Sequence, residues 1–124
     1  MQKKYFGIVI HGEGRGRNLG FPTINIELID SDLDIKNGVY CVRIDIHPQI
    51  YNGMLYVGTR PTFNMQKTTI EIHIFDFNEE IYDQQISFQI LHKIRNEIHF
   101  KCTEELIKQL HQDKKIVYNY FNPF

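Results

Sequence analysis

Apolar and polar positions alternate along much of the first hundred residues, and the pattern is clearest at 69–75. Isoleucines occupy Ile70, Ile72 and Ile74, and Glu71 and His73 separate them. Because successive side chains of a strand point to opposite faces, this segment predicts a strand with the isoleucines on one face and the polar residues on the other.

Five further segments also predict strands, because they are apolar, β-branched or alternating and are bounded by turn residues. They are 6–10, 24–28, 39–46, 54–58 and 86–94. The pairs Asn37-Gly38 and Asn52-Gly53 each predict a turn before a strand. Six strands at these spacings are typical of an all-β barrel or sandwich.

The period changes at 103, after which Leu106, Leu110 and Val117 recur at helical spacing. Thr103 is a suitable N-cap for this helix. We therefore expect one domain over 1–124, with a closed antiparallel barrel at about 5–100 and a helix at about 103–120.

Composition and charge narrow the classes of function. The chain has 124 residues, of which 42% are hydrophobic and 23% charged, as in ordinary globular domains. The net charge of -1 provides no excess of positive charge for nonspecific nucleic-acid binding, so we expect no nucleic-acid partner. There is no apolar run of roughly 20 residues and no signal peptide, so we expect no membrane partner and a cytoplasmic protein. We expect Cys41 and Cys102 to be small buried hydrophobes.

The most unusual segment is rich in glycine and contains two arginines. Its notable residues are Gly12, Gly14, Arg15, Gly16, Arg17 and Gly20. Free backbone N–H groups in such a loop form an anion-binding concavity, which makes phosphate a natural ligand. The segment matches neither the Walker A loop nor the dinucleotide fingerprint. A barrel loop without a ligand is the alternative.

Thr23 and Asn25 follow this segment and share one face of a predicted strand. Their neutral oxygens suit Mg²⁺ that is also bound by phosphate and water. The same spacing suits a hydrogen-bonded Thr–Asn pair at a strand start, and the residues alone favour that interpretation while leaving the cation site open.

The run HGEGRGRNLGFPTIN at 11–25 resembles the signature of riboflavin kinases, which in bacteria form the C-terminal module of bifunctional FAD synthetases. The first block is highly specific, and weaker matches continue in order along essentially the whole chain. They lie at 37–40, 58–63, 70–77, 81–82, 94–97 with Phe100, and 106–113.

The resemblance implies a six-stranded antiparallel Greek-key barrel with a C-terminal helix, and ATP-dependent phosphorylation of the riboflavin 5′-hydroxyl to give FMN and ADP. The glycine-rich segment would cover the ATP phosphates. Thr23 and Asn25 would bind the nucleotide and Mg²⁺ or another divalent cation. Glu71 would be the general base, and Arg95 would lie near the flavin. Without the resemblance, the residues alone favour an exposed strand carboxylate at Glu71, because glutamate is mostly exposed.

The chain departs from the family at Ile24, where a small residue is usual, and at Asp83, where glycine is common. No part of it corresponds to an N-terminal FMN adenylyltransferase domain, so a stand-alone monomeric kinase and an excised module both stay open. A non-catalytic flavin- or nucleotide-binding barrel is the alternative function. We expect His73 to be a bystander, and the role of Arg60 stays undecided.

Overall fold

The computed structural model describes residues 3–12, 20–29, 34–63 and 65–123, although the side chains of 60–62 are not described. These residues form six strands and one helix. The elements are β1 (Lys4–Ile10), β2 (Ile24–Leu28), β3 (Gly38–Ile46), β4 (Gln49–Thr62), β5 (Met65–Ile74), β6 (Gln85–Asn96) and α2 (Thr103–Phe121).

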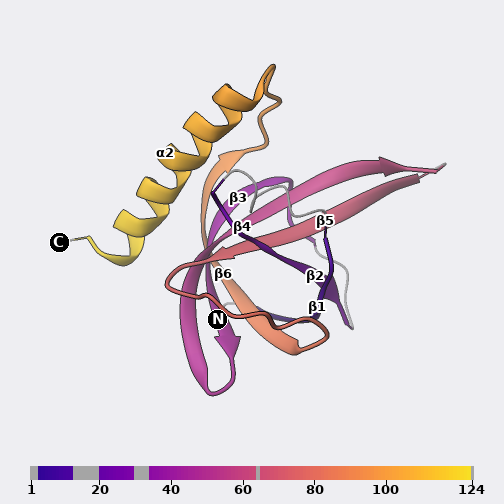
Figure 1. The fold of residues 1–124 in the computed structure, drawn as a ribbon, viewed down its shortest axis with the longest axis vertical. Coiled ribbons are helices and arrows are strands. Elements are labelled where there is room, and N and C mark those ends of the chain that lie inside the picture. Colours follow the sequence, from indigo (N-terminus) through magenta and orange to yellow (C-terminus); the bar gives the residue numbers. More distant parts are fainter. Residues whose placement is uncertain (1–2, 13–19, 30–33, 64, 124) are drawn as a thin grey trace.

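The strands close into an antiparallel barrel in the order β1-β2-β5-β4-β3-β6 (Figure 1). Pairing of β1 with β6 completes the barrel, with Gly7 opposite Ile86. The predicted fold class, an all-β six-stranded antiparallel barrel with a C-terminal helix, is therefore confirmed. The strand order also brings β2 beside β5, two strands that are far apart in the sequence.

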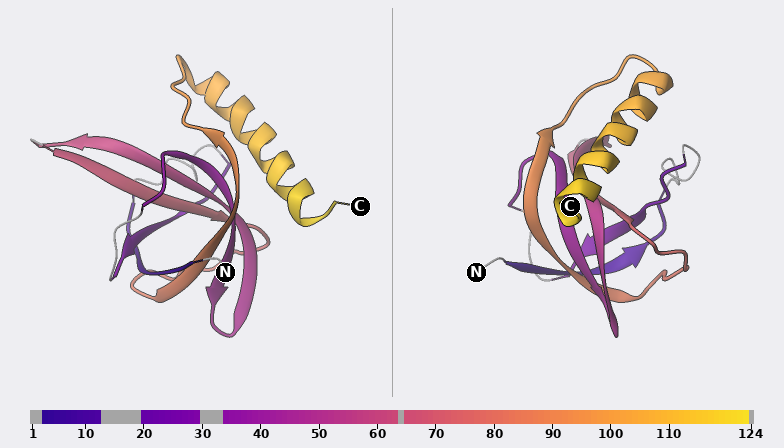
Figure 2. Two further views of the ribbon diagram at one scale, coloured as in Figure 1. Left: turned by 180° about the vertical axis from the view of Figure 1, so that it is seen from behind. Right: turned by 90° about the vertical axis from the view of Figure 1, so that its left-hand side faces the viewer.

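The alternation read from the sequence places one face of each strand inside the barrel. Ile70, Ile72 and Ile74 belong to the interior cluster, and Ile24 packs against it. A second buried cluster lies outside the barrel, where Val117 of α2 packs with residues of β3 and β4. Both views in Figure 2 show α2 along the outside of the barrel. Glu71 and His73 therefore lie on the outer wall, the side on which the helix packs.

The turn predicted at Asn52-Gly53 is wrong, because both residues lie inside β4. Gly53 pairs with Val42 on one side and Ile74 on the other. A side chain at Gly53 would place its Cβ 2.7 Å from the carbonyl oxygen of His73. Glycine is needed there for close approach of two strands, not for a turn.

The prediction that Thr103 caps the helix is also wrong. Thr103 is the first helical residue, and the N-cap is Cys102, which makes no side-chain capping hydrogen bond. Cys41 is buried as predicted, but Cys102 is exposed because it lies in the connection ahead of the helix. Asp83 adopts a φ of 66°, so it takes the left-handed conformation that glycine would otherwise supply. Within the described residues, no helix is both long and apolar enough to cross a membrane.

Candidate active site

The neighbouring strands β2 and β5 bring three predicted site residues together on the outer wall. Asn25 lies directly opposite Glu71 in the strand register. The Thr23 hydroxyl, just before β2, donates a hydrogen bond of 3.2 Å to Glu71 Oε1. Thr23 is 48 positions from Glu71, so their contact depends on the barrel's strand order.

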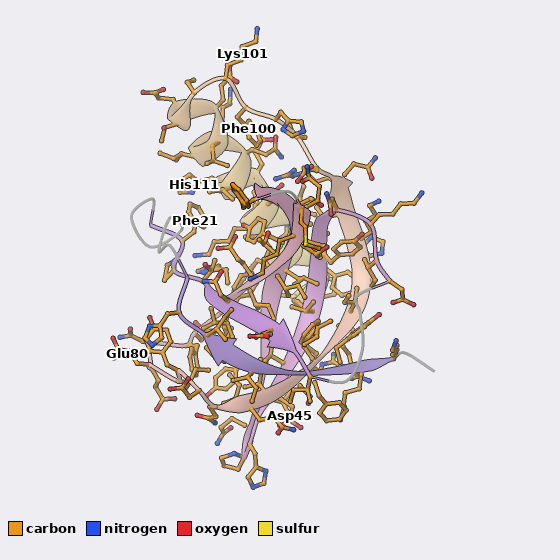
Figure 3. All side chains as sticks on the ribbon, turned by 90° about the vertical axis from the view of Figure 1, so that its right-hand side faces the viewer. Phe21, Asp45, Glu80, Phe100, Lys101 and His111 are labelled. Atoms are coloured by element: carbon orange, nitrogen blue, oxygen red, sulfur yellow. The ribbon has the colours of Figure 1, made fainter. Side chains whose placement is uncertain are left out.

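Two cavities meet at this cluster. The first, of about 620 Å³, lies among the barrel wall, the segment 97–102 and α2, and its lining includes Phe21, Tyr56 and Leu110. The second, of about 580 Å³, is lined in part by Gly12 and Asn25. Four residues line both cavities, and they are Gly58, Thr69, Glu71 and Glu97. Figure 3 shows Phe21, Phe100 and His111 toward the helix end of the molecule, with Asp45 and Glu80 toward the opposite end.

Gly12 brings the start of the glycine-rich segment against this cluster. A side chain at Gly12 would overlap the Asn25 amide, so only glycine allows the backbone to lie this close. Gly20, at the other end, has a φ of 85°, which favours glycine. The predicted residues between them, Gly14, Arg15, Gly16 and Arg17, lie outside the described residues.

Arg95 lines the first cavity, and two of its three side-chain nitrogens donate to the helix while Nη1 donates to the carbonyl oxygen of Asn96. Its Nε and Nη2 donate to the two carboxylate oxygens of Asp113 at 2.8 and 2.7 Å. Asp113 is fully buried and also accepts a hydrogen bond from Gln109. The sequence analysis did not single out Asp113. Its position between Leu110 and Val117 places a carboxylate on the apolar face of the helix, and this pattern could have indicated a buried ion pair.

His73 anchors the residues ahead of β2. Its Nδ1 lies 2.8 Å from the carbonyl oxygen of Pro22, and its ring meets Phe21 edge-on. Burial lowers the pKa of His73, the hydrogen bond to Pro22 opposes this shift, and the charge of Lys114 adds to the lowering. The side chain is buried, so His73 holds the approach to Thr23 rather than reaching solvent.

Tyr56 lies on β4 directly opposite Glu71 and forms part of the wall of the first cavity. Its hydroxyl donates a 3.5 Å hydrogen bond to Met54 Sδ. Burial raises the pKa of Tyr56, the charge of Asp113 adds to the rise, and Arg95 opposes it. Tyr56 is therefore a neutral phenol at any ordinary pH. No motif or pattern in the sequence around Tyr56 indicated that it would line a cavity.

The donor atoms suit a divalent cation that is shared with phosphate. Thr23 and Asn25 supply neutral oxygens beside the Glu71 carboxylate, and Mg²⁺ prefers oxygen ligands of this kind. Among the described residues, no group of three His, Cys, Asp or Glu side chains could hold a metal ion. Thr23 and Asn25 are therefore the described residues whose oxygens could take part in holding such a cation.

The flavokinase family model, described as riboflavin kinase, matches residues 2–121. The chain belongs to the riboflavin kinase family. It is 40% identical over 119 residues to the bifunctional riboflavin kinase/FMN adenylyltransferase of Bacillus subtilis, and 42% identical over 120 residues to that of Haemophilus influenzae. These matches cover 94% and 96% of this chain but only 38% and 39% of the relatives. The chain thus spans a little over a third of the length of these relatives.

Two solved structures share the fold. A structure described as a macrolide-efflux protein from Streptococcus pneumoniae is 36% identical, with a TM-score of 0.88, and the match covers 95% of this chain and 39% of that one. The riboflavin kinase of Trypanosoma brucei is 20% identical, with a TM-score of 0.63, and the match covers 98% and 82%. At that identity, the second likeness supports the fold alone.

Proposed function

We propose that this chain is a riboflavin kinase, which transfers the γ-phosphoryl group of ATP to the 5′-hydroxyl of riboflavin and releases FMN and ADP. One observation carries the proposal. Glu71 lies where the two cavities meet, beside Thr23 and opposite Asn25. A two-substrate transfer needs such a junction, because the reacting atoms must come within roughly 3–3.5 Å of each other.

The cavities differ in their linings, which supports placing one substrate in each. The first has apolar walls from Phe21, Tyr56 and Leu110 with polar groups at its edge, which suits a flat aromatic ring system. The second begins at Gly12 and includes the polar side chains of Asn25 and Lys67, which suits a triphosphate. We therefore place the flavin in the first cavity and ATP in the second.

The acceptor is a primary alcohol, a weak nucleophile that loses its proton during the reaction. Its oxygen forms a bond to the γ-phosphorus, the bond from that phosphorus to the β–γ bridging oxygen breaks, and the electron pair leaves with ADP. Glu71 takes the hydroxyl proton as general base. The hydrogen bond from Thr23 holds the Glu71 carboxylate at the junction.

Thr23 and Asn25 are the residues that would hold Mg²⁺ together with the phosphate oxygens of ATP. Once bound, the cation neutralises charge that develops on the phosphoryl group. The protein's own part is to present two neutral oxygens, from Thr23 just before β2 and from Asn25 within it, next to the base. The backbone at Gly12 then lies close enough to the Asn25 amide to keep it in place.

The relatives carry FMN adenylyltransferase as a second activity. We place residues 1–124 in a single kinase domain, so we expect FMN and no FAD from this chain. We also expect it to act as a monomer in the cytoplasm, with small molecules as its partners. An N-terminal adenylyltransferase domain would belong to the full-length protein if this chain is a module of it.

The test is to incubate the purified chain with riboflavin, ATP and Mg²⁺ and to separate the flavins by chromatography. We expect FMN only when all three are present. Glu71→Gln should lower kcat by about 10²–10⁴-fold while riboflavin and ATP still bind. The matched control is Glu80→Gln, because Glu80 is exposed and lines neither cavity.

Unchanged turnover in Glu71→Gln would remove Glu71 from the role of base. If the wild-type chain forms no FMN but quenches riboflavin fluorescence in a saturable way, the chain is a flavin-binding module and not a kinase.

A further inference from the structure

Glu97 is the second carboxylate at the junction of the two cavities. Of the four residues that line both, Gly58 has no side chain and Thr69 carries a hydroxyl, so Glu71 and Glu97 are the two acidic groups. Residues that line both cavities lie nearest to the point where the substrates meet. Glu97 therefore has a place in the site that the role of Glu71 does not explain.

The local fold holds Glu97 in this position. It follows the end of β6, where Arg95 is fixed by its paired hydrogen bonds to Asp113. The backbone of Gly38 lies so close to the Arg95 carbonyl that a side chain would overlap it. A Cβ atom at Gly58 would lie 3.3 Å from Glu97 Oε2, so the carboxylate lies over a position without a side chain. The lack of a side chain at Gly58 thus leaves room for the Glu97 carboxylate at the junction.

The contacts of Glu97 within the described residues contribute little to the stability of the fold. In the part of the chain that the structure describes, its one close basic neighbour is His99, at 3.8 Å, which is charged only when protonated and whose side chain is 94% exposed. Exposed pairs of this kind add little stability. By contrast, Glu71 accepts a hydrogen bond from Thr23. The oxygens of Glu97 are thus available to accept hydrogen bonds from a substrate.

We infer that Glu97 accepts a hydrogen bond from a hydroxyl of the riboflavin ribityl chain and so directs the 5′-hydroxyl toward Glu71. This inference rests on the proposed function. The ribityl chain links the ring to the 5′-hydroxyl and carries a row of hydroxyl donors. With the ring in the first cavity and the 5′-oxygen at Glu71, these donors pass the junction that Glu97 lines. An ionised carboxylate accepts hydrogen bonds and donates none, so it complements a row of hydroxyl donors.

The experiment compares Glu97→Gln with the wild-type chain, using riboflavin and lumiflavin as two probes. Lumiflavin has the same ring system with a methyl group in place of the ribityl chain. We expect the Kd of riboflavin, from fluorescence quenching, to rise about tenfold, because a hydrogen bond to a charged acceptor is lost. The Kd of lumiflavin, the KM of ATP and the Mg²⁺ dependence of turnover should stay unchanged. Glu80→Gln is the control for loss of one carboxylate.

Three results would overturn the inference. Equal weakening of both flavins would mean that Glu97 shapes the ring cavity, and no weakening of either would mean that it does not contact the flavin. An increased Mg²⁺ requirement would make it a cation ligand instead. Failure of the proposed function is recognised separately, because the wild-type chain itself would then form no FMN.

Discussion

At the scale of single residues, close packing at Gly12 joins the start of the glycine-rich segment to Asn25. The backbone of Gly12 lies against the Asn25 amide, and Asn25 lies opposite Glu71 in the strand register. A glycine at this position is therefore a steric requirement of the site. The motif showed the glycine, but only the structure shows which side chain requires it.

Gly12→Ala should raise the KM of ATP and the Mg²⁺ concentration needed for half-maximal turnover, because the new methyl group displaces the Asn25 amide. Steady-state kinetics at several Mg²⁺ concentrations measure both quantities. Asn25→Ala should reproduce the change in Mg²⁺ dependence. If Gly12→Ala behaves as wild type, the amide of Asn25 does not serve the nucleotide or its cation.

The ion pair between Arg95 and Asp113 is expected to contribute strongly to the stability of the fold. Asp113 is fully buried, so Asp113→Ala leaves the Arg95 charge without its partner. The free energy of unfolding should fall by about 3–5 kcal/mol, as measured in urea. The exposed Lys115 on the same helix is the control, where Ala should change stability by less than about 0.5 kcal/mol. A loss below about 1 kcal/mol for Asp113→Ala would show that the pair does not hold the helix on the barrel.

At the scale of elements, the site depends on how β5 holds the residues ahead of β2. His73 of β5 contacts the carbonyl of Pro22, and Glu71 of the same strand accepts the hydrogen bond from Thr23. Two residues of one strand, both on its outer face, thus hold consecutive residues of a distant segment. This arrangement fixes the position of the residues that lead into β2.

Because the pKa of His73 is lowered in the folded protein, its titration should make stability depend on pH. The unfolded chain binds the proton at about pH 6.5, whereas the folded chain resists protonation until lower pH. Stability is therefore full above about pH 6.5 and is lost as the pH falls toward the folded pKa. Urea unfolding at about pH 7.5 and 5.5 should show this loss in the wild-type chain.

His73→Asn should reduce the difference between the two pH values, because asparagine can still donate to Pro22 but does not titrate. His47→Asn, in the exposed turn between β3 and β4, is the control and should leave the difference unchanged. An undiminished pH dependence in His73→Asn would assign it to other groups.

At the scale of the whole molecule, the barrel wall and the helix enclose one cavity while the barrel rim forms the other. The two cavities meet on the outer wall, so the barrel interior is free to serve as a packed apolar core. Charge is nearly balanced over the chain as a whole. The chain therefore lacks the large positive excess that is typical of a nucleic-acid-binding domain.

We accordingly expect no salt-sensitive binding of RNA. Fluorescence anisotropy of a labelled single-stranded RNA, at roughly 50 and 200 mM salt, tests this directly, because phosphate contacts weaken steeply as salt rises. Saturable binding at low salt that disappears at high salt would contradict the expectation and would point to a local basic surface.

The sequence predicted the strands and the helix more successfully than it predicted the role of individual glycines. The strand at 69–75 and the terminal helix followed from their periods. The family resemblance singled out Thr23, Asn25 and Glu71 as candidate site residues, and the structure brings Thr23 and Asn25 to Glu71. The turn at Asn52-Gly53 could not be judged correctly, because a glycine needed for close strand approach looks the same in the sequence as one needed for a turn.

The sequence by itself determined the periods of the elements, the apolar face of each strand and the family signature, since all of these are local properties. The tertiary structure decided which distant groups meet. The strand order placed Thr23 against Glu71, helix docking placed Asp113 against Arg95, and the end of β6 brought Glu97 to the junction of the cavities. Such contacts depend on which strands become neighbours and how the helix packs, and no local pattern of apolar and polar residues encodes them.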